Sequence, residues 1–513
     1  MYDLVIKNGE VITDNQTLNV DIGITDGIIK ALDKNLKGKQ IIDAKGCVVS
    51  PGFIDMHTHS DISFILHPTN DSKLYQGVTT ELTGCCGFSY FPYTNRGMEL
   101  QEKNLELTEY DSRSITTFIE KFKRPMSINW AGLVGHGPLR LSVVGDLDVV
   151  ATESQIDEMK TLLDKELSSG AYGLSLGMAY APGMFANTKE YIELAKIVKK
   201  HNKLISAHIR NENVNVFGAV KELIEIGETS GAHVHISHLK LGYGSWHQAE
   251  ELLNIIDSAS KRGVYITFEQ YPYIASATGL SAVLPNWVHD GGTEKMMYRF
   301  KHERESVIKG IEADNSYKMG LDRVVVVSTK GLISEGDGKS IREISKLLKV
   351  SEPETVIYLL ENLNCDVPTI RFTMAQEDVY KIARRLDCAV ISDGSAYSLN
   401  PNEVDGMPHP RSFGTFPRYL KLNRELGWMS LENALYKMTG LPAKLMGLEN
   451  RGSIQLNYHA DITIFDKNTI ADKATYDHSI AAPIGVEYVI VNGSVALQKG
   501  KALKRAGEIL LNL

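Results

Sequence analysis

The stretch Pro51–Asp61, PGFIDMHTHSD, is the segment from which the fold and the site are predicted, together with the residues that recur at later strand ends. An apolar run and a Pro-Gly turn lead directly into His57 and His59. In a β-strand, residues two apart point the same way, so the two imidazoles would face one point. Two histidines satisfied by neighbours near a strand end are the structural alternative, and a motif this short does not choose between them.

Composition bounds the class of protein. The chain has 513 residues, 43% hydrophobic residues and a formal net charge of −8. That is ordinary globular composition, long enough for more than one domain, and the mildly acidic balance gives no electrostatic case for nucleic acid or an anionic membrane as partner. No apolar run approaches the roughly 18–20 residues of a membrane-spanning helix. The start, MYDLVIKNGEVITDN, does not resemble a signal peptide.

The cysteines are few and odd in number, which argues against a disulfide framework. They are Cys47, Cys85, Cys86, Cys365 and Cys388. The sequence therefore predicts a protein of a reducing cytoplasm.

Both ends of the chain are rich in β-strand patterns. The first fifty residues or so alternate apolar and polar residues, with Asn8-Gly9 and Asp26-Gly27 between the runs, which is a hairpin signature. The last sixty repeat this pattern, with Asn492-Gly493 as the turn. Because chain termini often lie close together, we expect one small β-sandwich built from residues 1–52 and 453–513.

The middle of the chain alternates short apolar strands with amphipathic helical stretches such as TESQIDEMKTLLDKELSSG and NVFGAVKELIEIGETSG. Such alternation indicates parallel strands, and eight of them predict a (β/α)8 TIM barrel over residues 53–452. A doubly wound open sheet is the alternative, but no G-x-G-x-x-G follows the early strands. Residues 287–373 are too long for one connection, so we expect a lid-like insertion after strand seven.

The ends of the predicted strands carry residues that bind metals. In a barrel of this kind the chemistry lies at the carboxyl ends of the strands. The residues found there are His57, His59, Cys86, His208, His238 and Asp393. Each alone has an ordinary structural explanation, but turn and packing needs do not explain all of them on one face. Together they predict a metal centre, and imidazoles with a thiolate suit zinc.

Neighbouring residues compete for some of these roles. In HVHISH, His233 and His235 fall within the strand and His238 at its end, so His238 is preferred. His136 also ends a strand and is a candidate for substrate contact or support of the site. Cys85 and Cys86 point to opposite faces if extended, so at most one of them faces the metal.

At this point the residues match a known family. The chain resembles the amidohydrolase superfamily and, within it, the N-acyl-D-amino-acid deacylase (D-aminoacylase) family. The likeness covers nearly the whole chain. It rests on segments such as PGFIDMHTHSD, GVTTELTGCCGFSYFP, GAYGLSLGMAYAPGMFA, AHIRNE, ISHLK, YPYIAS, SDG and HPRSFGTFPRYL, in this order.

The resemblance implies a role for each matching residue. Three residues match the ligands of one tightly bound Zn²⁺: Cys86, His208 and His238. His57 and His59 match the pair that serves a second, weaker metal position, and Asp393 matches the catalytic carboxylate. The substrate's α-carboxylate is expected to be held by Lys240, Tyr271 and Arg411. Tyr180 is a candidate to polarise the scissile carbonyl. Cys85 replaces the family's usual Asn before the ligand cysteine, and Cys86 is preferred because it directly precedes Gly87.

The implied activity is zinc-dependent hydrolysis of the amide bond of small N-acyl-D-amino acids, with Asp393 as general base and acid. A homo-oligomer is compatible with the resemblance. One rival is a cyclic-amide hydrolase of the dihydropyrimidinase or dihydroorotase type, which typically needs a carboxylated lysine where this chain reads YGLSLGM. The other rival is a non-catalytic protein on the same scaffold.

Overall fold

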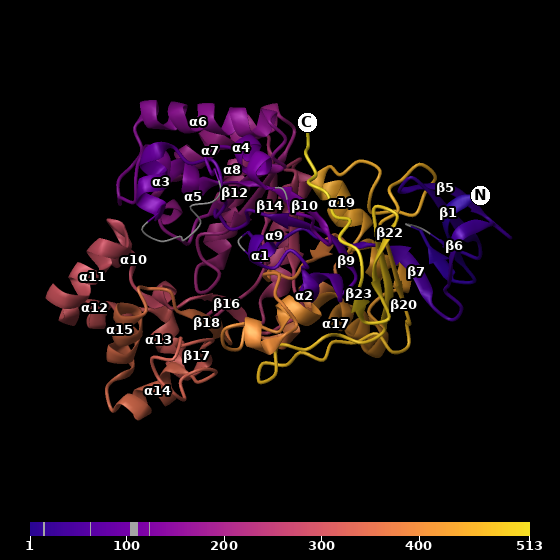
Figure 1. The fold of residues 1–513 in the computed structure, drawn as a ribbon. Helices are drawn as coiled ribbons and strands as arrows, with labels where there is room; N and C mark the ends of the chain where they lie inside the picture. The colour runs from indigo at the N-terminus through magenta and orange to yellow at the C-terminus, as the bar shows by residue number, and fades with distance from the viewer. Residues whose placement is uncertain (14–15, 62, 103–110, 123) are drawn as a thin grey trace.

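The computed structural model describes residues 1–13, 16–61, 63–102, 111–122 and 124–513. Its centre (Figure 1) consists of a three-stranded sheet in the order β10–β9–β8 and a six-stranded sheet in the order β11–β12–β13–β14–β15–β19. Neighbouring strands in both sheets are parallel. The strands are β8 (Phe53–Asp55), β9 (Val78–Thr83), β10 (Asn129–Gly132), β11 (Val134–Gly135), β12 (Gly173–Gly177), β13 (Leu204–His208), β14 (His233–Ile236), β15 (Ile266–Gln270) and β19 (Cys388–Val390). The predicted α/β class is confirmed.

The two sheets are connected at both of their edges. β10 is followed by β11 after Leu133, and a parallel bridge between Thr58 and Gly394 joins the segments that follow β8 and β19. The bridge places the segment that follows β19 beside the segment that follows β8. Because all of these strands are parallel, their carboxyl ends gather at one side of the molecule.

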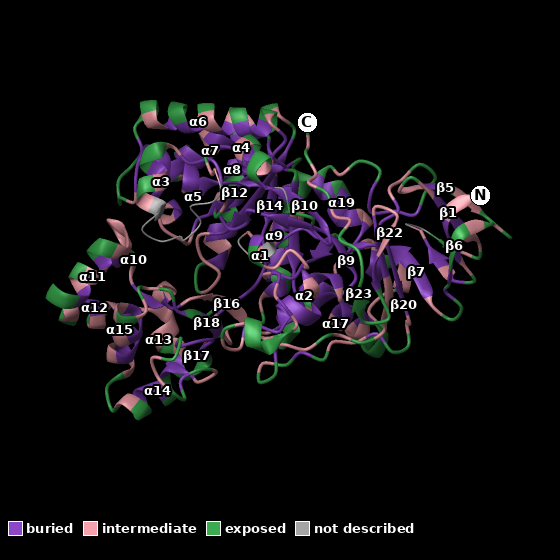
Figure 2. Cartoon of the chain, viewed as in Figure 1, coloured by how far each residue is buried: buried purple, intermediate pink, exposed green. Residues whose placement is uncertain are grey.

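Helices cover the strands from outside. α7 shows how the sequence specifies them: the side chain of Asn187 accepts the N–H of Glu190 at its start (3.0 Å). Tyr191, Leu194 and Val198 then recur at helical spacing on its buried face. In Figure 2 the strands are buried, while α6 and its neighbours present exposed outer faces. These helices are α1 (Ser63–Leu66), α2 (Asp71–Leu74), α3 (Asn95–Glu102), α4 (Ile115–Lys121), α5 (His136–Val143), α6 (Glu153–Ser168), α7 (Thr188–Lys200), α8 (Val216–Ser230), α9 (Ala249–Lys261), α16 (Gln376–Ala383), α17 (Arg411–Leu426), α18 (Leu431–Tyr436) and α19 (Gly440–Met446).

Strands from both ends of the chain share one seven-stranded sheet, in the order β23–β22–β21–β20–β7–β2–β3. The N-terminal and C-terminal strands of this sheet meet where β7 pairs antiparallel with β20, and Figure 1 shows these two strands side by side. A four-stranded sheet, β5–β4–β1–β6, packs its apolar residues into the same core. The strands are β1 (Tyr2–Lys7), β2 (Glu10–Ile12), β3 (Thr17–Leu18), β4 (Asp21–Thr25), β5 (Ile28–Asp33), β6 (Gly38–Asp43), β7 (Val48–Pro51), β20 (Ile462–Phe465), β21 (Val486–Val491), β22 (Ser494–Gln498) and β23 (Lys501–Ala502).

Two of the three predicted hairpin turns are confirmed. Asp26-Gly27 joins the antiparallel strands β4 and β5, and Asn492-Gly493 joins β21 and β22. The prediction at Asn8-Gly9 is wrong, because β1 pairs with β4 and β6 whereas β2 pairs with β3 and β7. The tight turn is present, with Asn8 at φ 60°, but it passes the chain from one sheet to the other.

Between β15 and β19 the chain forms a unit with its own core. β16, β18 and β17 make a three-stranded antiparallel sheet, and helices pack around it through residues such as Phe300 and Leu360. The first strand of this unit, β16, begins at Ser276. Its elements are β16 (Ser276–Gly279), α10 (Asn286–His289), α11 (Gly292–His302), α12 (Arg304–Ala313), α13 (Asn315–Met319), β17 (Val324–Val326), α14 (Ile341–Leu348), α15 (Glu352–Asn362) and β18 (Pro368–Arg371). Across the described residues, no helix combines the length and hydropathy needed to cross a membrane.

Candidate metal centre

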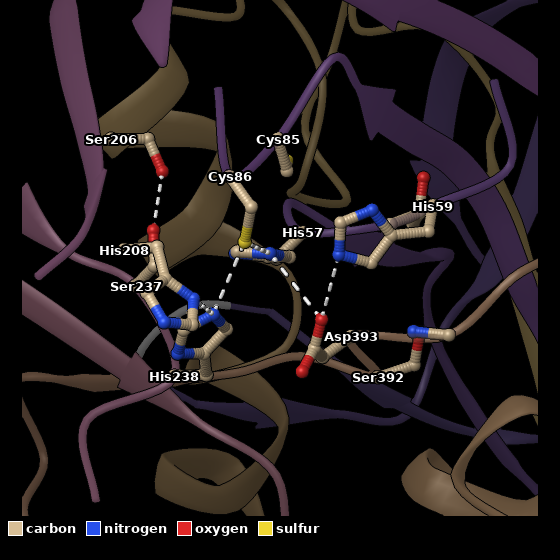
Figure 3. A network of polar contacts seen from close by, with 12 residues as sticks. His57, His59, Cys85, Cys86, Ser206, His208, Ser237, His238, Ser392 and Asp393 are labelled. Atoms are coloured by element: carbon tan, nitrogen blue, oxygen red, sulfur yellow. Dashed lines mark hydrogen bonds and ion pairs between the residues drawn. The ribbon is translucent and has the colours of Figure 1, made fainter. Parts of the chain in front are cut away.

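The candidate ligands come together at the carboxyl ends of the parallel strands (Figure 3). His208 is the last residue of β13, and the others lie in the short segments that follow β8, β9, β14 and β19. The residues brought together are His57, His59, Cys86, His208, His238 and Asp393. All are buried except His59, which is half-buried.

Cys86, His208 and His238 form one group of donor atoms. The Sγ of Cys86 lies 3.2 Å from Nε2 of His238, and this nitrogen lies 3.1 Å from Nδ1 of His208. All three donors fall within 4.8 Å of one another. Two imidazoles and a thiolate suit Zn²⁺, and three protein ligands leave a fourth position for water or substrate. The donor set therefore fits a catalytic zinc.

A second group shares the same sulfur. Cys86 Sγ lies 3.3 Å from Nε2 of His57, and Asp393 Oδ1 lies 3.1 Å from Nε2 of His59 and 3.5 Å from Nε2 of His57. These four donors also fall within 4.8 Å of one another. Because Cys86 belongs to both groups, its sulfur stands between two candidate ion positions.

The backbone is strained where the donors are presented. Cys86, His238 and Asp393 have φ values of 52°, 36° and 51°, the left-handed region that costs a non-glycine residue of order 1–3 kcal/mol. Gly87 follows at φ 79°, and a Cβ there would lie 2.5 Å from the backbone nitrogen of Gly177. The Cys-Gly pair thus lets the loop turn sharply against β12, which directs the Cys86 side chain inward.

The two adjacent cysteines differ in environment. Burial alone raises the pKa of a thiol, but His238 and His57 outweigh burial and hold the pKa of Cys86 well below its usual range. Burial raises the pKa of Cys85 well above its usual range, and its Sγ donates to the carbonyl oxygen of Leu82 at 3.8 Å. Cys86 therefore has the thiolate character that a ligand needs, which favours it over Cys85.

Asp393 is held as a carboxylate. Its Oδ2 lies 2.6 Å from Nη1 of Arg411. Burial alone would raise the pKa of Asp393, but Arg411 and the adjacent histidines hold this pKa well below its usual range. A buried carboxylate that stays ionised beside a candidate metal position can accept a proton from water.

Comparison with known proteins agrees with this geometry. The amidohydrolase family profile matches residues 40–348 and 406–497. The chain belongs to the amidohydrolase family. It is 31% identical over 506 residues to a D-aminoacylase of Alcaligenes xylosoxydans xylosoxydans, covering 97% of this chain and 95% of the relative. It is 32% identical over 516 residues to an N-acyl-D-glutamate deacylase of the same organism, covering 99% and 96%.

A solved structure supports the same family assignment. The N-acyl-D-glutamate deacylase of Bordetella bronchiseptica, in complex with zinc and a phosphonate inhibitor, superposes with a TM-score of 0.83 at 30% identity, covering 99% of both chains. The chain is thus an amidohydrolase of the D-aminoacylase family, and a hydrolase, as its sequence predicts.

In this amidohydrolase, two of the predicted carboxylate-binding residues line one cavity of about 950 Å³ together with Cys86 and Asp393. These two residues, Lys240 and Arg411, are both buried. Lys240 Nζ donates to Oε1 of Glu212 at 2.7 Å. Both cations are therefore paired with carboxylates of the protein, Arg411 with Asp393 and Lys240 with Glu212.

The two predicted tyrosines occupy different positions. Tyr180 lines the cavity, its ring centre lies 4.6 Å from that of His208, and its hydroxyl lies 3.2 Å from Oγ1 of Thr278. Tyr271 is not among the lining residues: it is 1% exposed and lies behind Arg411, whose Cζ is 4.9 Å from its ring centre. Tyr271 thus packs against Arg411, and because its hydroxyl has no hydrogen-bond partner among the described residues, its role toward the substrate's α-carboxylate stays a prediction.

Two glutamates that the sequence analysis did not select complete the site. Glu212 lies 3.1 Å from Nδ1 of His238 and 3.6 Å from Nε2 of His208, and it belongs to the AHIRNE segment, four residues after His208. Glu269 is fully buried on β15 and bonds Nδ1 of His57. Carboxylates that hold the second ring nitrogen of a ligand histidine fix its orientation. The sequence could have indicated Glu269, because it is a charged residue inside an otherwise apolar strand pattern.

The competing histidines lie elsewhere. His235 Nε2 contacts Glu269 Oε2 at 3.0 Å, so it holds this glutamate rather than a metal. His233 Nε2 lies 2.7 Å from Oγ1 of Thr267. His136 is buried at the start of α5, where Nε2 lies 2.8 Å from Glu190, and it is not among the described residues that line the cavity. None of the three belongs to either donor group.

Proposed function

We propose that this amidohydrolase is a zinc-dependent deacylase that cleaves the amide bond of N-acyl-D-amino acids, yielding a carboxylate and a free D-amino acid. The observation that carries the proposal is the grouping of Cys86, His208 and His238 beside an ionised Asp393, in one cavity with Arg411 and Lys240. The relatives named above are deacylases of this kind, and one of them is described with zinc and a mimic of the reaction's tetrahedral intermediate.

Zinc would be held by Cys86, His208 and His238, and His57 with His59 would serve a second, weaker position. When bound, zinc supplies a Lewis acid that polarises a carbonyl and lowers the pKa of water toward 7. The chain's own residues prepare the donors. Glu212 and Glu269 accept hydrogen bonds from the ligand histidines and so hold their rings in position.

Asp393 moves the proton in this mechanism. Its carboxylate takes one proton from the attacking water as the water oxygen bonds to the carbonyl carbon. The same carboxyl then gives that proton to the amide nitrogen as the C–N bond breaks. Water is consumed, and the products are a carboxylic acid and an amine. Tyr180 would donate its hydroxyl to the carbonyl oxygen, and its position among the residues that line the cavity supports this role.

Arg411 and Lys240 would hold the substrate's α-carboxylate. A planar guanidinium binds a carboxylate through two parallel hydrogen bonds, and an ammonium adds a point charge. Because Arg411 is also the counter-charge of Asp393, a bound carboxylate would share that guanidinium with the catalytic group. This couples substrate binding to the protonation of Asp393.

The domain arrangement belongs to the same proposal. We propose that residues 53–452 form one closed (β/α)8 barrel, that residues 1–52 and 453–513 form a β-sandwich, and that residues 287–373 act as a lid. The bridge between Thr58 and Gly394 supports closure of the barrel. Residues of the inserted unit, among them Thr369 and Arg371, line the cavity, which supports the lid.

The free thiols of all five cysteines support a reducing cytoplasm.

Turnover of a small substrate panel by the zinc-loaded protein tests the proposal. We expect hydrolysis of N-acetyl-D-amino acids, with the L-enantiomers much slower. Preferential cleavage of dihydrouracil or hydantoin would favour the cyclic-amide alternative, although β12 carries no lysine to bridge two metals. Absence of hydrolysis throughout the panel, with zinc bound, would favour a non-catalytic role.

A further inference from the structure

Arg371 reaches the same cavity from the inserted unit. It is the last residue of β18, where its Cα partners are Ser276 of β16 and Val324 of β17, and its side chain lines the cavity of about 950 Å³. No role in the mechanism above uses it.

A short chain of contacts connects Arg371 to the metal centre. The ring of Tyr180 packs on His208, and its hydroxyl lies 3.2 Å from Oγ1 of Thr278 on β16. The carbonyl oxygen of Thr278 accepts the hydroxyl of Thr369, two residues before Arg371, at 2.7 Å. These contacts connect β18, the strand that carries Arg371, to the candidate zinc ligand His208, and both residues line the same cavity.

The guanidinium of Arg371 lacks a counter-charge. Its Nη2 donates to the neutral hydroxyl of Ser316, and its Nε is buried without a hydrogen-bond acceptor. Among the described residues no carboxylate lies within ion-pair distance of it, whereas Arg411 and Lys240 each have one. The nearby Asp314 accepts the N–H of Ser316 at 2.7 Å and caps α13.

This arrangement has an energetic consequence. Burial lowers the pKa of Arg371, with partial opposition from Asp314, Tyr180 and Glu212. A partly buried cation without an anionic partner is unfavourable, and removing such a group from water is offset only when an anion and hydrogen bonds replace the solvent. Arg371 lines the cavity, no charged partner among the described residues accepts from its guanidinium, and that group has the fork geometry that fits a carboxylate.

We propose that Arg371 binds the side-chain carboxylate of the substrate, so that the preferred substrates are N-acyl derivatives of acidic D-amino acids. The inference rests on the proposed deacylase function and adds the side-chain class to it. Arg411 and Lys240 are assigned to the α-carboxylate. A third cation in the same cavity then matches a substrate that carries a second negative charge.

The test compares two substrates of nearly equal shape. N-acetyl-D-glutamate and N-acetyl-D-glutamine differ by one charge, so the ratio of their kcat/KM values isolates what Arg371 contributes. An arginine–carboxylate interaction in a desolvated site predicts a preference of roughly 10- to 100-fold for the acid. Arg371→Met should bring this ratio close to one, mainly through a higher KM for the acid. Arg323→Met removes an exposed arginine of the same unit and should keep the ratio.

The outcomes separate this inference from the function on which it rests. If the unsubstituted protein hydrolyses N-acetyl-D-glutamine with a kcat/KM at least as high as that for N-acetyl-D-glutamate, the proposed role of Arg371 is wrong. The protein would then still be a deacylase, but one of neutral substrates. An acid preference that survives in a folded Arg371→Met protein also overturns it. If Arg371→Met does not fold, competitive inhibition of the unsubstituted protein replaces it: glutarate should bind at least tenfold more tightly than butyrate, and equal inhibition counts against the proposal.

Discussion

Replacing Asp393 by asparagine removes the proposed proton carrier. The amide keeps the size of the side chain and one oxygen acceptor, but it cannot take a proton from water. A positioned general base and acid typically contributes 10²–10⁴-fold, so we expect kcat/KM to fall by at least about 100-fold. Cys86, His208 and His238 are untouched, so zinc at the tight position should be retained.

The same substitution has a predictable effect on stability. Arg411 is 4% exposed and has Asp393 as its carboxylate partner, at 2.6 Å. Removing one partner of a buried ion pair typically costs about 3–5 kcal/mol, and the bordering cavity should bring the cost below that range. The fall in the free energy of unfolding should appear as a lower urea midpoint with an unchanged slope.

Three measurements on matched proteins decide this prediction. Turnover of an N-acetyl-D-amino acid, zinc content and urea unfolding are compared for Asp393→Asn and for Asp387→Asn, an exposed aspartate just before β19. The control should behave like the unsubstituted protein in all three. Asp393→Asn with full zinc and near-normal turnover would refute the assigned role. A loss of turnover that follows a loss of zinc would make Asp393 a ligand rather than a proton carrier.

Three further predictions use other parts of the chain. Cys86→Ala should lose zinc whereas Cys85→Ala keeps it, and metal analysis showing the reverse would move the ligand to Cys85. Lys240→Met should raise KM for N-acyl-D-amino acids but not for the same compounds with an amidated α-carboxyl group; an equal rise for both contradicts carboxylate binding. Glu166, 1% exposed, has its pKa raised by burial to about 7, so the folded protein should lose stability as pH rises from about 4.5 to 7. Between pH 5 and 8, the free energy of unfolding of Glu166→Gln should therefore rise by about 1–3 kcal/mol relative to that of the unsubstituted protein. Urea unfolding at several pH values measures this difference, and a difference that does not change with pH would refute the prediction.

The gathering of the candidate ligands could be predicted because it follows from topology. Residues at the carboxyl ends of the strands of a parallel barrel come together, so the positions of His208, His238 and Asp393 along the sequence predicted their gathering, whereas the choice of Cys86 over Cys85 rested on the family resemblance. The strand periodicity and the long interval before β19 likewise indicated the α/β class and the inserted unit. These signals depend on local pattern and chain order, which a single sequence contains.

Contacts between distant residues could not be predicted in the same way. Glu269 and His57 are 212 residues apart, and nothing local says that a buried glutamate faces an imidazole from another strand. The turn at Asn8-Gly9 shows the same limit. Its residues specify a backbone conformation, but the partners of the flanking strands are set by which sheet buries their apolar faces. Tyr271, too, lies behind Arg411 because of side-chain packing rather than chain order.

The strained turn at Asp393 shows how such distant contacts complete the site. Lys73 of α2 is fully buried, and its Nζ donates to Oγ of Ser392 at 2.6 Å and to the carbonyl oxygen of Gly394 at 2.8 Å, the residues on either side of Asp393. It also donates to Oδ2 of Asp55 at 2.8 Å, and the other oxygen of Asp55 accepts the N–H of Ser392 at 3.0 Å. The charge-assisted hydrogen bonds from Lys73 to Ser392 and Gly394 offset the cost of the left-handed φ of Asp393, which is unfavourable for a non-glycine residue. The position of the proposed catalytic carboxylate therefore depends on Lys73, which binds the residues on both sides of it, and the ends of β8 and β19 are joined where the proposed reaction takes place.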